Sequence, residues 1–175
     1  MIAPLSLSNV LTVVIAVCCL STISPHSRGE VVKLWRLAVP ACLAAVEAIV
    51  LLAVVFDATF THDAEWLIAA AVGSILGRMR GWTMPIAVDQ ARELVRLRRS
   101  FDGQLAAVAL VVLAFVDFTG AALEDAILPC EYTAALAALF AGYIAARSVA
   151  VAVRAGRAPH VELLDSQRAN TTSPI

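Results

Sequence analysis

Three charged residues lie inside long apolar runs of this sequence, where side chains of their types can do chemistry. Glu47 lies about 15 Å along a helix that would begin at residue 37, far from either end of its run. A carboxyl group in such surroundings is costly, so it is expected to move a proton, bind a ligand, pair with a cation or stay protonated. Arg147, in the run 132–153, is the candidate cation for an ion pair with Glu47, and a hydrogen bond to a Ser or Thr of a neighbouring helix is the alternative. Asp117 lies late in the run 103–123, close enough to its end to reach water.

The other reactive residue types form no recognisable catalytic arrangement. Cys18, Cys19 and Cys42 lie inside apolar runs, where a thiol behaves as a small hydrophobic side chain, and the sequence has no C-x-x-C motif. It also has no H-E-x-x-H motif and no glycine-rich phosphate loop. We therefore expect no enzymatic activity, no cofactor and no metal site.

The composition indicates a protein whose solvent is lipid. Of 175 residues, 61% are hydrophobic and 15% are charged, and the mean hydropathy is +0.84. Soluble domains have about 45–50% apolar and about 25% charged residues. A chain of this size cannot bury so much apolar surface in water. The sequence therefore predicts an integral membrane protein that contacts the lipid bilayer. We expect it to bind no nucleic acid.

Five apolar segments approach the length of about 20 residues that crosses a bilayer as a helix. They are 5–23, closed by Ser24-Pro25, then 37–56, 61–80, 103–123 and 132–153. The third is the weakest, because only residues 66–77 are strictly apolar. This segment reaches spanning length if the polar residues at both ends of 61–80 are included in the helix. The alternative is a re-entrant segment that enters and leaves the bilayer on the same side. We expect an all-α membrane domain of five transmembrane helices over residues 1–154, followed by a disordered tail, 155–175.

The distribution of charge predicts the orientation of these helices. All 13 Lys and Arg residues fall in the stretches 28–36, 78–99 and 147–168, whereas the connections 57–65 and 124–131 carry only acidic charges. Cytoplasmic loops are enriched in Lys and Arg. The pattern therefore places the N-terminus outside and the C-terminus in the cytoplasm. If the third segment did not cross, acidic and basic connections would share one face.

The basic stretch between the third and fourth segments is expected to form a cytoplasmic surface. Residues 84–89 and 93–98 are short runs with β-branched residues that suit a hairpin, and the alternative is an amphipathic helix over 88–101 lying on the membrane. Either form exposes a set of arginines to lipid head groups or to a protein: Arg78, Arg80, Arg92, Arg96, Arg98 and Arg99.

Small residues spaced four apart predict where helices pack closely. Gly73 and Gly77 form such a pair in the third segment, and Gly142 lies in a similar series in the fifth. This spacing lets two helix backbones approach each other within a membrane.

The third segment and its basic loop resemble a known family. Gly73, Gly77-Arg78, Arg80-Gly81, Val88-Asp89 and Leu94-Val95, followed by an apolar span, resemble the CcdC-like proteins over about residues 69–114. These are small multi-pass membrane proteins of bacteria. The resemblance implies a bacterial cytoplasmic membrane and supports the hairpin. The family has no established activity, so it implies no mechanism.

Two functions follow from these features. The first is a non-enzymatic accessory or assembly subunit that acts through a membrane-protein partner or as a homo-oligomer. The alternative is a small transporter or channel component that uses Glu47. An internal similarity between 43–56 and 105–118 supports the alternative, because some transporters contain repeats. A Glu47 that water-soluble reagents reach would favour transport, and an inaccessible one would favour packing.

Overall fold

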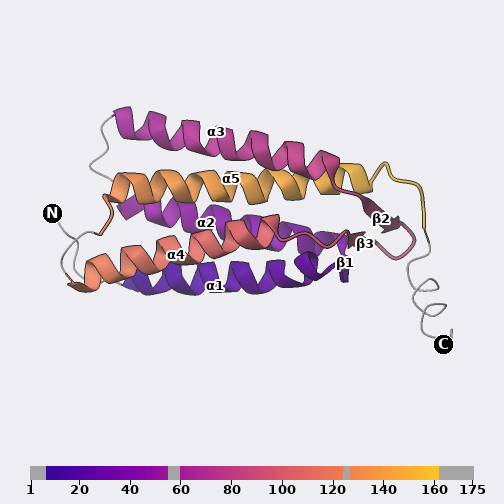
Figure 1. The fold of residues 1–175 in the computed structure, drawn as a ribbon, viewed down its shortest axis with the longest axis horizontal. Coiled ribbons are helices and arrows are strands. Elements are labelled where there is room, and N and C mark those ends of the chain that lie inside the picture. Colours follow the sequence, from indigo (N-terminus) through magenta and orange to yellow (C-terminus); the bar gives the residue numbers. More distant parts are fainter. Residues whose placement is uncertain (1–6, 55–59, 124–126, 162–175) are drawn as a thin grey trace.

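The chain forms a helical bundle with a small sheet at one end (Figure 1). The computed structural model describes residues 7–54, 60–123 and 127–161. Within them the α-helices are α1 (Leu7–Arg28), α2 (Ala38–Val54), α3 (Phe60–Thr83), α4 (Asp102–Leu123) and α5 (Cys130–Ala155). A 3-10 turn, η1 (Leu34–Leu37), leads into α2, and the strands are β1 (Val31–Lys33), β2 (Ile86–Asp89) and β3 (Leu94–Leu97).

Four of the described helical segments are long and apolar enough to cross a membrane. They are Leu7–Arg28, Leu34–Leu52, Asp102–Leu123 and Glu131–Ala155. The prediction of a mainly helical chain is thereby confirmed, and its four long apolar helices are compatible with an integral membrane protein. Helix α3 does not meet the same criterion, because acidic residues at its start and Arg78 and Arg80 near its end shorten its apolar stretch.

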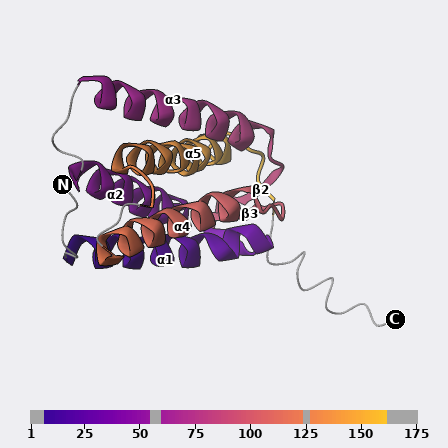
Figure 2. The same cartoon turned by 60° about the vertical axis from the view of Figure 1, so that its left-hand side comes forward.

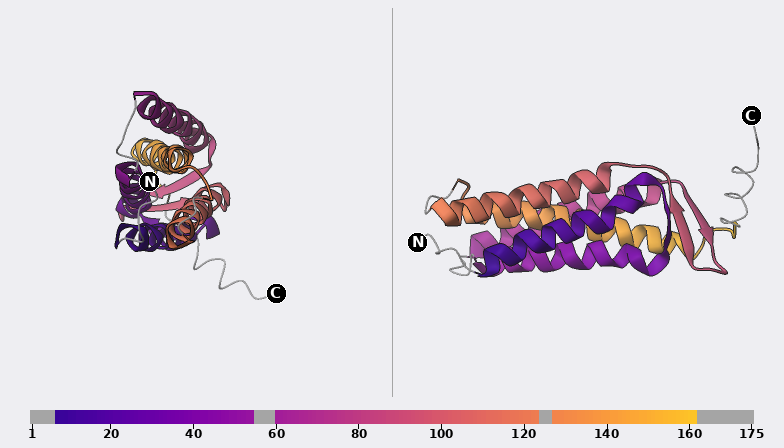
Figure 3. Two further views of the ribbon diagram at one scale, coloured as in Figure 1. Left: turned by 90° about the vertical axis from the view of Figure 1, so that its left-hand side faces the viewer. Right: turned by 90° about the horizontal axis from the view of Figure 1, so that it is seen from below.

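Successive helices run in opposite directions along one axis (Figure 1). The end-on view shows α3 at the edge of the bundle, next to α5 (Figure 3, left). Helix α5 is in contact with α2, α3 and α4, whereas α1 packs on α2 and α4. The internal sequence similarity compares the pair α2 and α3 with the pair α4 and α5. Helices α4 and α5 pack on each other, whereas α3 packs on α5 and not on α2, so the two pairs are packed differently.

Small side chains fill the centre of the bundle, and large apolar side chains cover much of its outside. The central cluster includes Cys19, Ala44, Ala107, Leu110, Ala137 and Ile144. Leu67 and Ile75 on α3, Val112 on α4 and Val149 on α5 are all more than half exposed. Exposed apolar faces of this extent are stable in hydrocarbon and unfavourable in water. Small central residues permit the close helix approach on which membrane bundles depend.

The basic loop forms the predicted hairpin, and the alternative amphipathic helix is wrong. Strands β2 and β3 pair antiparallel, and β1, from the connection between α1 and α2, adds a third strand in the order β1-β3-β2. The sequence analysis missed β1. Val32, Val95 and Val88 are neighbours across the sheet and lie on its buried face against Val151 and Ala155 of α5. Figure 2 shows this sheet capping one end of the helices.

Two predicted boundaries are wrong. Helix α1 continues through Pro25 to Arg28 instead of ending at residue 23, and its last turn is held by the buried residues His26 and Ser27. The tail is ordered further than expected. Val161 N–H donates to the carbonyl of Val88 at 2.9 Å, and the Gln90 amide donates to the carbonyl of Ala158 at 2.7 Å. Residues 156–161 therefore follow the sheet, and 162–175 lie outside the described residues.

Candidate functional site

Asp102, the first residue of α4, is the centre of a charged cluster at the sheet end of the bundle. Its Oδ2 atom lies 3.1 Å from Nε of Arg147 on α5 and 3.3 Å from Nε of Arg80 on α3. The Tyr143 hydroxyl donates a hydrogen bond to the same oxygen at 2.7 Å. One carboxylate oxygen therefore joins three helices through two guanidinium groups and a phenol. Its other oxygen, Oδ1, is buried without a hydrogen-bond partner among the described residues.

Arg147 is buried at this cluster and does not reach Glu47. Its side chain is only 7% exposed, and Nη2 lies 3.2 Å from the sulfur of Met84. The expected ion pair between Arg147 and Glu47 is therefore wrong, because the N-terminal turn of α4 presents a nearer carboxylate. Gly103 makes room for the guanidinium, since a Cβ atom there would lie 3.0 Å from Nη1.

Further contacts connect this cluster to the entrance of the hairpin. Nη2 of Arg80 lies 3.4 Å from the hydroxyl of Ser100, just before α4. Arg154 of α5 donates from Nη1 to the carbonyl oxygens of Gly81 at 2.8 Å and Met84 at 2.6 Å. Arg147 and Arg154 thus hold the end of α3 and the hairpin against α5. The sequence signal for Asp102 was an acid placed directly after a basic run, at the start of an apolar one.

Glu47 lies inside the apolar core without a partner. It is completely buried, and neither carboxyl oxygen has a hydrogen-bond partner among the described residues. Ala44, Ala48 and Leu51, one helical turn or less away on α2, belong to the central apolar cluster. An unpaired charge in such surroundings is very costly, so the protonated carboxyl is the form that this core accommodates best. This arrangement suits either a neutral packing group or an isolated proton acceptor.

Asp117 has a partner that the sequence analysis did not identify. The Asn9 amide of α1 donates to its Oδ2 at 3.0 Å, and Asn9 itself is buried. Asp117 is half-buried instead of forming a fully solvated helix end. Because the pair joins α1 to α4 at the end opposite the sheet, its geometry suits helix packing.

The predicted glycines lie in the contact between α3 and α5. A Cβ atom at Gly73 would overlap the carbonyl of Leu139, and one at Gly77 would overlap the carbonyl of Tyr143. Gly142 faces α3 in return, since its Cβ would lie 2.5 Å from the carbonyl oxygen of Ala70. Gly81 continues the same stripe one turn further. Its packing role was not predicted, because Gly81 follows the apolar run.

The predicted basic residues are exposed around the sheet. We call the following set the basic platform: Lys33, Arg36, Arg92, Arg96, Arg98 and Arg99, all of which are exposed. Arg78 and Arg80 are also exposed but lie on α3, and Arg80 belongs to the Asp102 cluster. Val31, Lys33, Leu94 and Arg96 occupy the face of the sheet opposite the buried valines. Nη1 of Arg92 lies 4.0 Å from Oδ2 of Asp89.

No described group of His, Cys, Asp and Glu side chains is arranged to hold a metal ion. Cys19 is buried, whereas Cys18 and Cys42 are exposed, so these three thiols do not converge. Comparison with protein-family models, with curated proteins and with solved structures gives no match. The resemblance to CcdC-like proteins therefore stays a prediction, and the function has to be argued from the geometry alone.

Proposed function

We propose that this chain is a five-span protein of a bacterial cytoplasmic membrane that acts, without catalysis, as an accessory or assembly subunit for a partner protein. The N-terminus lies outside and the sheet lies in the cytoplasm. The observation that carries the proposal is the basic platform, whose cations lie on and around a small sheet anchored to the bundle. A fixed set of cations offers an acidic partner surface both attraction and a defined orientation.

The orientation rests on the separation of charge along the bundle. Every described Lys and Arg lies at or near the sheet end, and α3 runs the length of the bundle beside α5 (Figure 1). We expect an alkaline phosphatase reporter to be active after Thr59 and inactive after Gln90, because phosphatase folds only outside the cytoplasm. Equal activity at the two positions would mean that α3 does not cross, and would contradict the five-span topology.

The sheet is built to present its cations to a partner. Its inner face packs Val32, Val88 and Val95 on the end of α5, so its outer face is held in place by burial of the inner one. Few acids compensate the platform. Asp89 is buried under Arg92, Glu93 is exposed in the hairpin turn, and Glu30 lies 4.0 Å from Arg28, outside the platform. The remaining cations are available to acidic side chains.

A photo-crosslinking amino acid at position 96 tests this proposal in cells at native expression level. We expect one discrete adduct with a different protein, identifiable by mass spectrometry, because Arg96 lies on the outer face of the sheet. The matched control is the same probe at Tyr132, an exposed position at the other end of the bundle. An adduct only with a second copy of the chain, or none at position 96, would contradict the accessory role.

Glu47 supports a second candidate, a small transporter or channel component. Its unpartnered carboxyl at the centre of the core is the arrangement that a proton-carrying group requires. If Glu47 serves transport, Glu47→Gln abolishes proton or cation flux in proteoliposomes while expression stays unchanged, because the amide matches the acid in size but carries no exchangeable charge. Glu47→Leu is the packing control. Wild-type flux in Glu47→Gln would exclude this role.

A further inference from the structure

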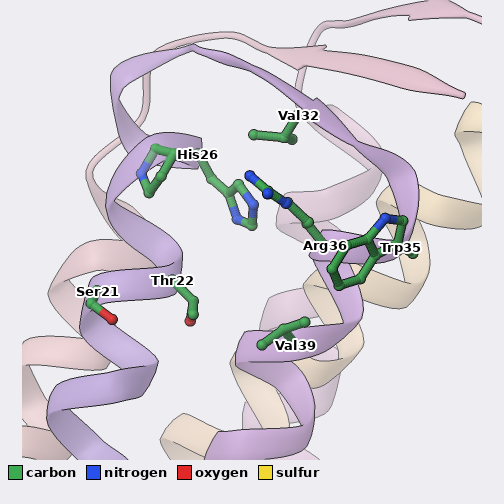
Figure 4. A pocket seen from close by; sticks show the side chains of 8 residues that line it. Ser21, Thr22, His26, Val32, Trp35, Arg36 and Val39 are labelled. Atoms are coloured by element: carbon green, nitrogen blue, oxygen red, sulfur yellow. The ribbon is translucent and has the colours of Figure 1, made fainter. Parts of the chain in front are cut away.

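A cavity of about 300 Å³ opens between α1 and the start of α2, beneath strand β1 (Figure 4). It is lined by Ser21, Thr22, Pro25, His26, Val32, Trp35, Arg36 and Val39. Neither the Asp102 cluster nor the apolar core around Glu47 includes these residues. The walls are mainly apolar; His26 and Arg36 lie toward the sheet end, whereas Ser21 and Thr22 lie farther from it (Figure 4).

Arg36 gives the cavity a positive charge, and His26 adds an imidazole ring that can donate a hydrogen bond. Figure 4 shows the imidazole and the guanidinium pointing toward one another across it. His26 is only 4% exposed, and its backbone carbonyl accepts a hydrogen bond from Gly29 N–H at 3.3 Å at the end of α1. The charges that act on it are those of Arg147 and Arg36, and both are positive. Among the described residues, neither His26 nor Arg36 forms an ion pair with an acidic side chain, so the cavity can accept an anion.

Arg36 is held in position while its head group stays accessible. Its guanidinium carbon lies 5.7 Å from the centre of the Trp35 ring, within the range of a cation–π contact. Trp35 is 58% exposed, and η1 carries both residues directly before the apolar segment of α2. Tryptophan and arginine at the end of a membrane helix lie at the level of the lipid head groups. The cavity therefore lies where a lipid phosphate and its glycerol would be found.

We propose that this cavity binds the head group of an anionic phospholipid of the cytoplasmic leaflet. The phosphate accepts hydrogen bonds from Arg36 and from His26, and the glycerol and upper acyl carbons contact Val39, Thr22 and Pro25. The inference rests on the proposed membrane orientation but not on a protein partner. The bound lipid would join α1 to α2 below the sheet and support β1.

The test uses the full chain purified in a mild detergent and native mass spectrometry with added lipid. We expect phosphatidylglycerol to bind about fivefold more tightly than phosphatidylcholine, and Arg36→Gln to remove that preference, the size expected for one cation near an anionic lipid. Arg98→Gln is the matched control, because it removes the same charge from an exposed position outside the cavity. Val39→Phe narrows the cavity without changing charge and should also weaken phosphatidylglycerol binding.

Three results would overturn the proposal. Equal binding of the two lipids to the wild-type chain would mean that the cavity does not select an anion. An equal loss in Arg36→Gln and Arg98→Gln would assign lipid binding to the general charge of the platform. Full competition by millimolar inorganic phosphate would make the ligand a soluble anion. Each result can be read even if the crosslinking experiment finds no partner protein, so the two proposals fail separately.

Discussion

Gly77→Ala should detach α3 from the bundle. A Cβ atom at this position overlaps the backbone carbonyl of Tyr143, and a backbone atom cannot turn aside as the end of a side chain can. The two helices must move apart, and α3 has its principal packing contact with α5. We expect the free energy of unfolding in detergent to fall by about 3 kcal/mol, the upper part of the range for overpacked cores. The measurement is reversible denaturation followed by circular dichroism.

Gly156→Ala is the matched control for this substitution. Gly156 follows the end of α5 with φ −66°, which any residue adopts, and a Cβ there meets no atom closer than 3.7 Å. Its substitution should change stability by less than about 0.5 kcal/mol, as exposed positions usually do. If Gly77→Ala were as harmless as Gly156→Ala, the close contact between α3 and α5 would not exist in the membrane protein.

Asp102→Ala should cost about 3–5 kcal/mol, the usual effect of leaving one partner of a buried ion pair without the other. Arg147 would keep its charge at a site that is 7% exposed, with the Met84 sulfur as its remaining polar contact among the described residues. Tyr143 and Arg80 would lose the same acceptor. Stability of the purified variant in detergent measures the cost.

A second substitution distinguishes an unpaired charge from simple loss of packing. Arg147→Met in the Asp102→Ala background removes the stranded cation and should recover most of the lost stability, because a buried ion pair can be replaced by apolar groups at little cost. Glu30→Ala is the control for an exposed pair: Glu30 lies 4.0 Å from Arg28 with both side chains more than half exposed, and its loss should cost less than about 1 kcal/mol. No recovery in the double variant would show that the Asp102–Arg147 charge pair is not the source of the stability.

Much of the bundle was predictable because the signals are local. A helix that crosses about 30 Å of hydrocarbon needs a long apolar run, and the four strongest runs are the four helices with spanning properties. The hairpin was predictable for a similar reason, since two β-branched runs flank a polar turn. Strand β1 was not, because a strand over Val31–Lys33 is too short to show a period and exists only through its pairing with β3.

The partners of the charged residues required the tertiary structure. Depth along a helix follows from the sequence, and it placed Glu47 well inside its segment. The relative rotation and shift of two helices do not follow from it. They place Arg147 beside Asp102 and leave the Glu47 carboxyl without a hydrogen-bond partner among the described residues. The His26–Arg36 cavity also depends on how elements are placed relative to one another. It forms where the last turn of α1 lies beside η1, and the connection between them carries β1.

The sequence by itself therefore predicted a lipid environment for this protein, the approximate extent of its helices and the end of the bundle at which its cations gather. Hydropathy and charge are properties of single residues, so they can be added over any stretch of the sequence without knowing the fold. Only the tertiary structure decided which glycines contact a backbone, which acid pairs with which arginine and which carboxyl group, in the described part of the chain, has no hydrogen-bond partner. Those outcomes depend on distances of a few ångströms between segments far apart in sequence, and side-chain packing sets them.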